Sequence, residues 1–283
     1  MLVFTMSSAT QQNDTNPPKR YLSSITFALS LVIALCVQAG EHGLPDAITG
    51  NAGPLTGQNI QYAPSDSQSV GYLAQPSGEG PFPSVILIHE WNGLVQRIKE
   101  TADSFADEGY TALAVDLYGG RTGSNPEENM ALVRETLAQP KQLIENLNSA
   151  VDFLKKQKGS NQKVATIGWC YGGGVALTFA LGGEHHDATA IFYGRLLADP
   201  QALSHVDHEF YGTFVENDRG IPVSDVENFV KVLRDAGVPN DVHIYDGVRH
   251  GFWLHVDRDP QANTRPAIDA WTRLKDFLNR TLL

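Results

Sequence analysis

The most constraining feature of this sequence is a β-branched stretch that runs into a glycine-flanked cysteine and then into apolar residues. Residues 164–167 are typical of a buried strand, and residues 175–179 suit a packed helix. Between them, Cys170 lies in a Gly-x-Cys-x-Gly pattern with Gly168 and Gly172. A strand that turns directly into a helix needs small neighbours, because the backbone doubles back on itself. We therefore expect Cys170 in strained dihedrals at the apex, where the helix N-terminus favours a thiolate. The alternative is a buried structural cysteine in a glycine-rich turn.

Predicted strands and helices alternate around this turn. Period-two alternation at 59–63 and 69–74 indicates an edge hairpin, and Ser224 with Glu227 forms a capping-box pattern. Further strands are predicted at 84–89, 111–115, 188–193, 211–215 and 241–245, with helices at 98–108, 126–138, 143–156, 224–236 and 266–282. Such alternation predicts an α/β fold of one domain, with a doubly wound, mostly parallel sheet.

Residues 1–39 are predicted to form a signal peptide. Two basic residues precede an apolar stretch at 21–37, and Val37-Gln38-Ala39 before Gly40 matches the small-x-small pattern of a cleavage site. An uncleaved N-terminal anchor remains an alternative, since the apolar stretch approaches spanning length. A lipid anchor at Cys36 is disfavoured by the bulky residue before it. We expect a periplasmic or secreted protein.

The mature chain is then expected to consist of a loose linker at 40–56 and one domain at 57–283. Cys170 would be its only thiol, because Cys36 leaves with the leader, so an internal disulfide is ruled out. The net charge of −11 argues against nucleic acid or an anionic membrane as a partner. Membrane contact is expected only through an uncleaved N-terminal segment. We expect a monomer.

A cysteine nucleophile needs a base and a residue that orients the base. Asp218 follows the predicted strand at 211–215, and His250 follows the strand at 241–245 in a glycine-flanked loop. The chain order of nucleophile, acid and histidine, each past a strand, is typical of α/β-hydrolases. His250 would accept the thiol proton and Asp218 would hold its tautomer. Each residue is common on protein surfaces, and Glu216 or Asp246 could supply the acid instead.

These motifs resemble the dienelactone hydrolase family over roughly residues 55–283. The resemblance depends on the Gly-x-Cys-x-Gly turn, on Asp218 shortly before Ile-Pro, and on His250-Gly-Phe. Further segments match in order, namely those at 88–93, 116–118, 192–194 and 270–271. The resemblance implies an α/β-hydrolase fold and a Cys-Asp-His triad that acts on ester or lactone carbonyls, without a cofactor or a metal.

The same resemblance implies further site residues. A Glu one position after the strand-end His touches the nucleophile in the family, and here that residue is Glu90. The backbone N–H groups of Trp91 and Tyr171 are the implied oxyanion-hole donors. Tyr193 and Trp253 are expected to contact the substrate.

The chain departs from the family at two positions that bind a substrate carboxylate. Arg121 lies one residue beyond the matching position, after an inserted glycine, although it is still expected to bind substrate. Leu254 occupies the second position and cannot bind an anion. Arg195, Arg249 and Arg258 are possible substitutes. We therefore expect neutral esters or lactones to be turned over at least as well as carboxylated ones.

Two other groups of residues are weaker indications of a functional site. The segment 184–187, Glu-His-His-Asp, resembles a metal site but is more simply interpreted as a solvated loop. Trp91, Trp169 and Trp253 could line an apolar pocket, although core packing explains them equally well.

The sequence thus predicts an exported hydrolase that cleaves small esters or lactones through a thioester. Three alternatives remain: a carboxylesterase or thioesterase for hydrophobic acyl groups, a non-catalytic binding relative, and a redox or peroxide-sensing thiol protein.

Overall fold

The structure is a computed structural model that describes residues 43–64 and 68–283. The predicted signal peptide lies outside the described residues, as does the centre of the predicted hairpin turn. Within the described ranges, no helix combines the length and the apolar composition that a membrane span requires. The described residues belong to one compact unit.

In this part of the chain, eight strands form one sheet in the order β1-β2-β4-β3-β5-β6-β7-β8. The first two pairings, β1 with β2 and β2 with β4, are antiparallel, and all the others are parallel. The doubly wound, mostly parallel sheet and its edge hairpin are therefore confirmed. The strands are β1 Gln58–Gln61, β2 Val70–Ala74, β3 Phe82–Ile88, β4 Thr111–Val115, β5 Ser160–Trp169, β6 Ala188–Phe192, β7 Glu209–Val215 and β8 Asn240–Tyr245.

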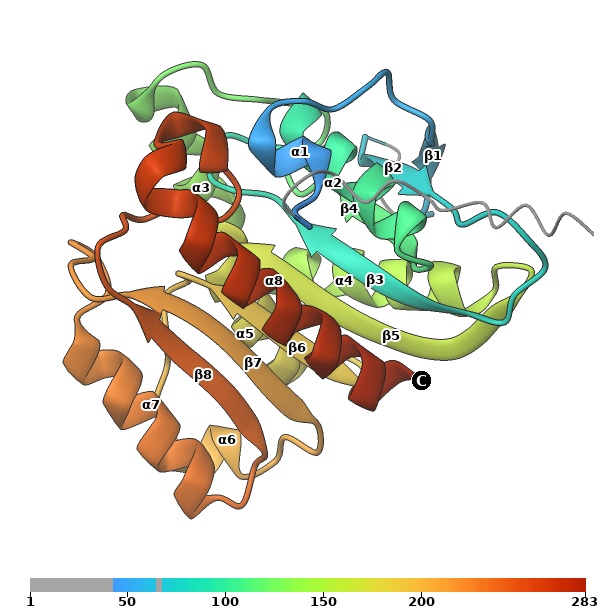
Figure 1. The fold of residues 1–283 in the computed structure, drawn as a ribbon. Coiled ribbons are helices and arrows are strands. Elements are labelled where there is room, and N and C mark those ends of the chain that lie inside the picture. The colour runs from blue at the N-terminus through green and yellow to red at the C-terminus, as the bar shows by residue number, and fades with distance from the viewer. Residues whose placement is uncertain (1–42, 65–67) are drawn as a thin grey trace, which may run out of the picture. The chain divides into compact units, whose positions relative to one another are not determined.

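Helices cover both faces of the sheet (Figure 1). On one face α1, α2 and α8 pack against the strands, around Phe105 and Trp271. On the other face α4, α5 and α7 cover the sheet, around Leu147 and Phe229. The helical elements are α1 Asp46–Thr49, α2 Gln96–Asp107, α3 Pro126–Leu137, α4 Pro140–Lys155, α5 Tyr171–Gly182, α6 Pro200–Leu203, α7 Val223–Asp235, the 3₁₀ turn η1 Val256–Arg258, and α8 Pro260–Leu282.

Part of the expected linker is packed on the domain. Residues 46–49 form the short helix α1, whose Ala47 and Ile48 are completely buried. The Arg97 guanidinium on α2 donates to the Ala47 carbonyl and also pairs with Asp257. The glycine and proline content of 40–56 suggested a loose chain, but two apolar side chains are enough to dock this turn against α2 and η1.

Two helix starts are capped differently from the prediction. The capping box is wrong, because α7 begins at Val223 with Pro222 as its N-cap, and no side chain caps it. The last helix begins at Pro260 rather than at Pro266, because Asp259 caps it by accepting from the Ala262 N–H. Pro266 is the seventh residue of α8 and lies inside the helix, where it removes one backbone hydrogen bond of the helical ladder.

The carboxyl ends of the central parallel strands lie at one edge of the sheet. The register pairs Ile88 with Gly168, Trp169 with Phe192, and Val215 with Tyr245. The segments that follow β3, β5, β7 and β8 are thereby brought together, and these segments contain the predicted site residues. In open α/β sheets this edge is where ligands bind.

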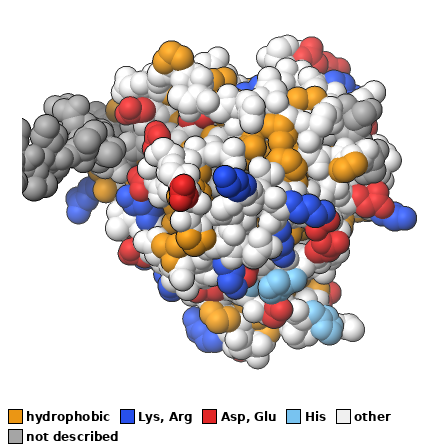
Figure 2. Space-filling model, turned by 90° about the vertical axis from the view of Figure 1, so that its right-hand side faces the viewer, with side chains coloured by type: hydrophobic (Ala, Val, Ile, Leu, Met, Phe, Trp, Pro, Cys, Tyr) orange, Lys and Arg blue, Asp and Glu red, His pale blue; other side chains and the backbone are white. Residues whose placement is uncertain are grey.

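The surface shown in Figure 2 mixes charges of both signs. Lys and Arg side chains are interspersed with Asp and Glu, and hydrophobic side chains are scattered among them. This face carries no extended basic patch of the kind that binds nucleic acid.

Candidate active site

Cys170 lies at the apex of the turn between β5 and α5. Its φ of 55° and ψ of −115° lie in a region that non-glycine residues rarely adopt, so the turn is strained as expected. The flanking glycines are required sterically. A Cβ at Gly168 would collide with the Gly172 carbonyl, and a Cβ at Gly172 would collide with the Ile88 carbonyl. The glycines therefore allow the backbone to double back, and the sulfur faces the sheet edge.

The groups around Cys170 shift the pKa of its thiol in opposite directions. Burial and the nearby Glu90 carboxylate raise the pKa of Cys170 to about 12, and Asp218 adds a smaller increase. The backbone N–H groups of Tyr171 and Trp91 lie against the sulfur and lower the pKa. These two donors come from the start of α5 and from the segment after β3, as expected for an oxyanion hole. The thiol is therefore protonated at neutral pH.

Asp218 and His250 come together from the loops after β7 and β8. The His250 Nδ1 lies 2.7 Å from the Asp218 Oδ2, and Gly220 N–H donates to the other carboxylate oxygen at 2.8 Å. The Asp218 side chain is 5% exposed, whereas that of His250 is 39% exposed. Because the carboxylate only accepts, Nδ1 carries the proton and Nε2 is left free to accept another. The alternative acids Glu216 and Asp246 do not hold this imidazole.

The segment after β3 is fixed by His89. Its Nδ1–H donates to the Glu90 carbonyl at 2.6 Å, and its Nε2 accepts from the Leu117 N–H at 3.3 Å. Burial lowers the pKa of His89, which agrees with a neutral ring. Tyr118 Oη donates to the Trp91 carbonyl at 3.2 Å. These bonds orient the peptide whose N–H faces the sulfur, a role that the sequence did not reveal.

Glu90 was expected to touch the Cys170 sulfur, but its carboxylate contacts His255. Its Oε2 lies 2.7 Å from the His255 Nε2, and within the described residues no hydrogen bond joins it to the Cys170 sulfur. The carboxylate therefore acts on the thiol through its charge. His255 was missed because no sequence pattern links it to a residue 165 positions away.

One cavity of about 370 Å³ contains the reactive groups. Its lining residues are Glu90, Trp91, Asn92, Cys170, His250, Gly251 and Arg258. Arg258 is exposed, and its guanidinium forms no ion pair with any described residue. Neither Arg195 nor Arg249 lines this cavity, so of the three possible substitutes the structure brings only Arg258 to Cys170.

Arg121 does not reach this cavity. It forms a two-pronged ion pair with Glu135, at 2.6 and 2.9 Å, and lines a separate cavity of about 330 Å³. The residues that follow the inserted glycine carry its side chain toward α3, where Glu135 lies. In this arrangement Arg121 does not line the cavity that contains Cys170, where we expected it to bind substrate.

Tyr193, Trp253 and Leu254 are buried in the core and do not line the cavity. Trp253 stacks on Trp169 with ring centroids 5.7 Å apart, so both tryptophans pack the interior. Tyr193 lies beneath His250, with ring centroids 4.8 Å apart, and its hydroxyl accepts from the Leu254 N–H at 3.4 Å. Tyr193 therefore supports the imidazole, and neither Tyr193 nor Trp253 lines the cavity in which we expected them to contact substrate.

The segment 184–187 is not simply a solvated loop. His186 is 1% exposed and lies 2.9 Å from the Thr189 hydroxyl, which also lies 2.8 Å from the His208 Nε2. Burial lowers the pKa of His186 to about 3, so the ring is neutral. Among the described residues, no group of three or more possible ligands is arranged to hold a metal ion.

The chain matches the model of the dienelactone hydrolase family over residues 70–282. It is 28% identical to a "Putative carboxymethylenebutenolidase" from Methylorubrum extorquens, over 90% of this chain and 91% of that protein. It is 31% identical to "Protein usf" from Aquifex pyrophilus, over 80% of this chain and 99% of that protein.

Solved structures support the same fold. A dienelactone hydrolase-like promiscuous phosphotriesterase from metagenomic libraries has a TM-score of 0.71 at 22% identity, covering 82% of this chain and 100% of its own. The dienelactone hydrolase from Anabaena variabilis has a TM-score of 0.57 at 21% identity, covering 80% of this chain and 99% of its own. With the family match extending over more than half of the sequence, the chain belongs to the dienelactone hydrolase family and has the α/β-hydrolase fold.

Proposed function

We propose that this protein hydrolyses small ester or lactone substrates through a Cys170–His250–Asp218 triad. The observation that carries the proposal is the 2.7 Å contact between His250 and Asp218 at the cavity that Cys170 also lines. Family membership supports an ester or lactone bond as the target. A cavity of about 370 Å³ is of a size that suits a small molecule.

The proposed reaction proceeds in two steps. His250 Nε2 takes the thiol proton as the sulfur attacks the carbonyl carbon, and the oxyanion forms against the N–H groups of Trp91 and Tyr171. His250 then gives the proton to the departing alcohol oxygen, which leaves a thioester on Cys170. Water, deprotonated by His250, attacks the thioester and releases the acid and the thiol. Asp218 holds the imidazole and stabilises its charged form.

A base is essential here because the thiol is not ionised on its own. With its pKa raised to about 12, the thiolate is a very small fraction of Cys170 at neutral pH.

The alternative of a carboxylesterase or thioesterase for hydrophobic acyl groups loses most of its support. It depended on Leu254 and three tryptophans as pocket residues, and only Trp91 lines the cavity, whereas Leu254, Trp169 and Trp253 are buried in the core.

A short-chain nitrophenyl ester assay tests the proposal against a binding protein and a redox thiol protein. We expect turnover by the wild type, loss of turnover in Cys170→Ala, and parallel loss of activity and labelling sites during titration with iodoacetamide. Full activity after stoichiometric labelling of Cys170 would reject the sulfur as the nucleophile.

Export to the periplasm or the medium is the second part of the proposal, and it depends on the sequence of residues 1–39 alone. Mature protein from a secreting host should begin near Gly40. An intact N-terminus in the membrane fraction would identify an uncleaved anchor instead.

A further inference from the structure

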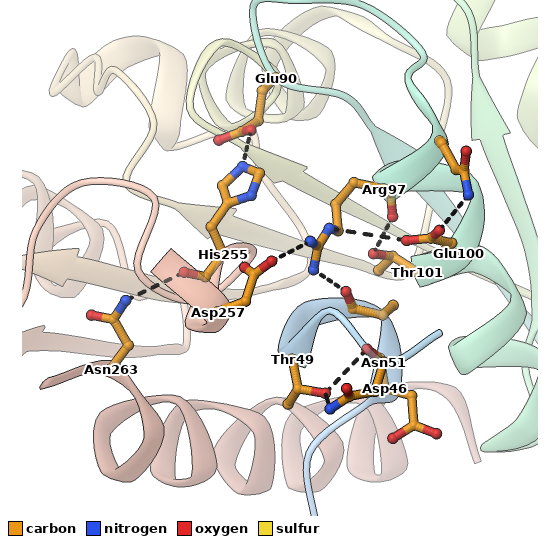
Figure 3. A network of polar contacts seen from close by, with 12 residues as sticks. Asp46, Thr49, Asn51, Glu90, Arg97, Glu100, Thr101, His255, Asp257 and Asn263 are labelled. Atoms are coloured by element: carbon orange, nitrogen blue, oxygen red, sulfur yellow. Dashed lines mark hydrogen bonds and ion pairs between the residues drawn. The ribbon is translucent and has the colours of Figure 1, made fainter. Parts of the chain in front are cut away.

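Glu90 and His255 form a buried pair at the wall of the catalytic cavity. Figure 3 shows the imidazole pointing at the carboxylate, with His255 Nε2 2.7 Å from Glu90 Oε2. The two side chains are 11% and 10% exposed. Since a carboxylate only accepts hydrogen bonds, the Nε2 of His255 carries the proton and donates it.

The position of the Glu90 carboxylate determines how readily Cys170 ionises. After burial, the charge of Glu90 is the largest cause that raises the pKa of the thiol. The Oε2 atom is occupied by His255, so the carboxylate acts on the sulfur at a distance. If that oxygen were released, the S–H group would be an available donor for it, and such a bond would stabilise the protonated thiol further.

The backbone that carries His255 is held by hydrogen bonds on both sides of the residue. The His255 N–H donates to the Gly251 carbonyl at 3.1 Å, and the His255 carbonyl accepts from Asn263 Nδ2 at 3.3 Å. Two residues later, Asp257 pairs with Arg97 at 2.6 Å. Figure 3 shows the contacts of Asn263 and Arg97 in one network that extends from Glu90 to α1.

The other titratable groups around the pair are few. Tyr193 and His89 face Glu90 from β6 and β3, and burial keeps both rings neutral by raising the pKa of Tyr193 and lowering that of His89. Arg258 lies at the rim of the cavity, and Asp257 is paired with Arg97. Two groups in the same cavity change charge during the proposed reaction, the Cys170 thiol and the His250 imidazole, and the charge of Glu90 raises the pKa of Cys170.

We propose that His255 is a positioning residue, whose Nε2–H holds the Glu90 carboxylate off the sulfur and so limits how strongly Glu90 keeps the thiol protonated. The inference depends on the proposed function in that it takes Cys170 to be the nucleophile. His255 itself does not touch the substrate.

The pH dependence of Cys170 alkylation tests this role directly. The full chain is treated with iodoacetamide, and labelling of the Cys170 peptide is followed by mass spectrometry for the wild type and its variants. In His255→Leu we expect alkylation at a fixed pH to slow about tenfold, the factor that corresponds to one pKa unit. His255→Gln should keep the wild-type rate, because its amide N–H can donate to Glu90.

A double variant shows whether the effect passes through Glu90. Glu90→Gln should accelerate alkylation, because it removes the charge, and His255→Leu should have no further effect in that background. An unchanged or faster rate in His255→Leu, or equal slowing in the double variant, would overturn the proposal.

Asn263→Ala is the matched control, since it loosens the same segment without removing the imidazole. We expect wild-type alkylation, and slowing equal to that of His255→Leu would reject a specific role for His255. Ester hydrolysis measured in parallel separates the two proposals. If the alkylation rates follow the expected pattern but no ester is hydrolysed, only the proposed function is rejected. If esters are hydrolysed but the alkylation rates do not follow the expected pattern, only the positioning role of His255 is rejected.

Discussion

The two ends of the parallel strands hold histidines in contrasting environments. At the carboxyl ends, His250 has a side chain that is 39% exposed and is paired with the Asp218 carboxylate at 2.7 Å. At the amino ends of β6 and β7, His186 and His208 are buried and share the hydroxyl of Thr189. The same side chain is therefore available for proton transfer at one end and fixed as a neutral packing group at the other.

Solvent access and a carboxylate partner account for the difference. An imidazolium at position 250 would be stabilised by Asp218 and by water, so this ring can gain and lose a proton. His186 has a hydroxyl and a carbonyl as partners, and burial opposes its charged form, as the lowered pKa of about 3 indicates. Four changes test this contrast.

Removing the imidazole at the carboxyl end of the strands should have the largest effect. In His250→Ala we expect kcat for a nitrophenyl ester to fall by about 10²–10⁴-fold, because the general base is lost. The fold should be unaffected, since His250 is partly exposed. His186→Gln is the control, with an expected change of less than twofold in kcat, and comparable losses in both variants would contradict the contrast.

Replacing Asp218, whose charge orients His250, should lower kcat by a smaller factor. In Asp218→Asn we expect a loss of kcat smaller than that of His250→Ala by about one to two orders of magnitude, because the imidazole remains but its tautomer is no longer fixed. Steady-state kinetics of both variants on the same ester measures the ratio. Unchanged kinetics would mean that another group orients the base.

The unpaired guanidinium at the cavity should influence substrate choice. The expectation that neutral substrates are favoured depended on Leu254 and on the displacement of Arg121. Leu254 is buried in the core and Arg121 pairs with Glu135, whereas Arg258 lines the cavity. We expect Arg258→Leu to lower kcat/KM for a carboxylated lactone about tenfold relative to its neutral analogue, because one charged hydrogen bond is lost. Arg249→Leu, outside the cavity lining, is the control. An equal change in kcat/KM for both substrates would rule out recognition of the acid group.

The smallest effect is expected for His186 at the amino ends of the strands, where the pH dependence of the free energy of unfolding should change. Because the folded state holds His186 neutral down to a pKa of about 3, the unfolded chain binds more protons below its ordinary pKa of 6.5. The free energy of unfolding should therefore fall as pH falls from 6.5 toward 3, by about 1–2 kcal/mol between pH 7 and pH 5. Urea unfolding of the wild type and His186→Gln measures this slope. An equally steep slope in the variant would assign the pH dependence to other groups.

Local patterns in the sequence predicted the framework of the site. Glycines beside Cys170 are required by the contacts of the turn itself, and the strands before Asp218 and His250 follow from short apolar runs. Parallel strands bring their carboxyl ends to one edge, so the order of these residues was enough to place them together. The edge hairpin was similarly local, because period-two alternation is a property of each strand.

Side-chain direction in the irregular segments could not be predicted in the same way. Tyr193, Trp253 and Leu254 follow strand ends and were expected near the substrate, yet all three turn into the core. The long Arg121 side chain can adopt many rotamers, and its ion pair with Glu135 fixes the position of the guanidinium. Loops have no periodicity from which the direction of a side chain can be read.

The sequence by itself therefore determined the family, the parallel sheet, the strained turn at Cys170 and the chain order of its partners, because each depends on neighbours within a few residues. Tertiary structure alone decided which carboxylate holds His250, that Glu90 is held by His255, and that Arg258 is the arginine at the cavity. It also decided that residues 46–49 dock on the domain through Arg97. These contacts join segments far apart in the chain, and their geometry depends on how whole helices and strands pack.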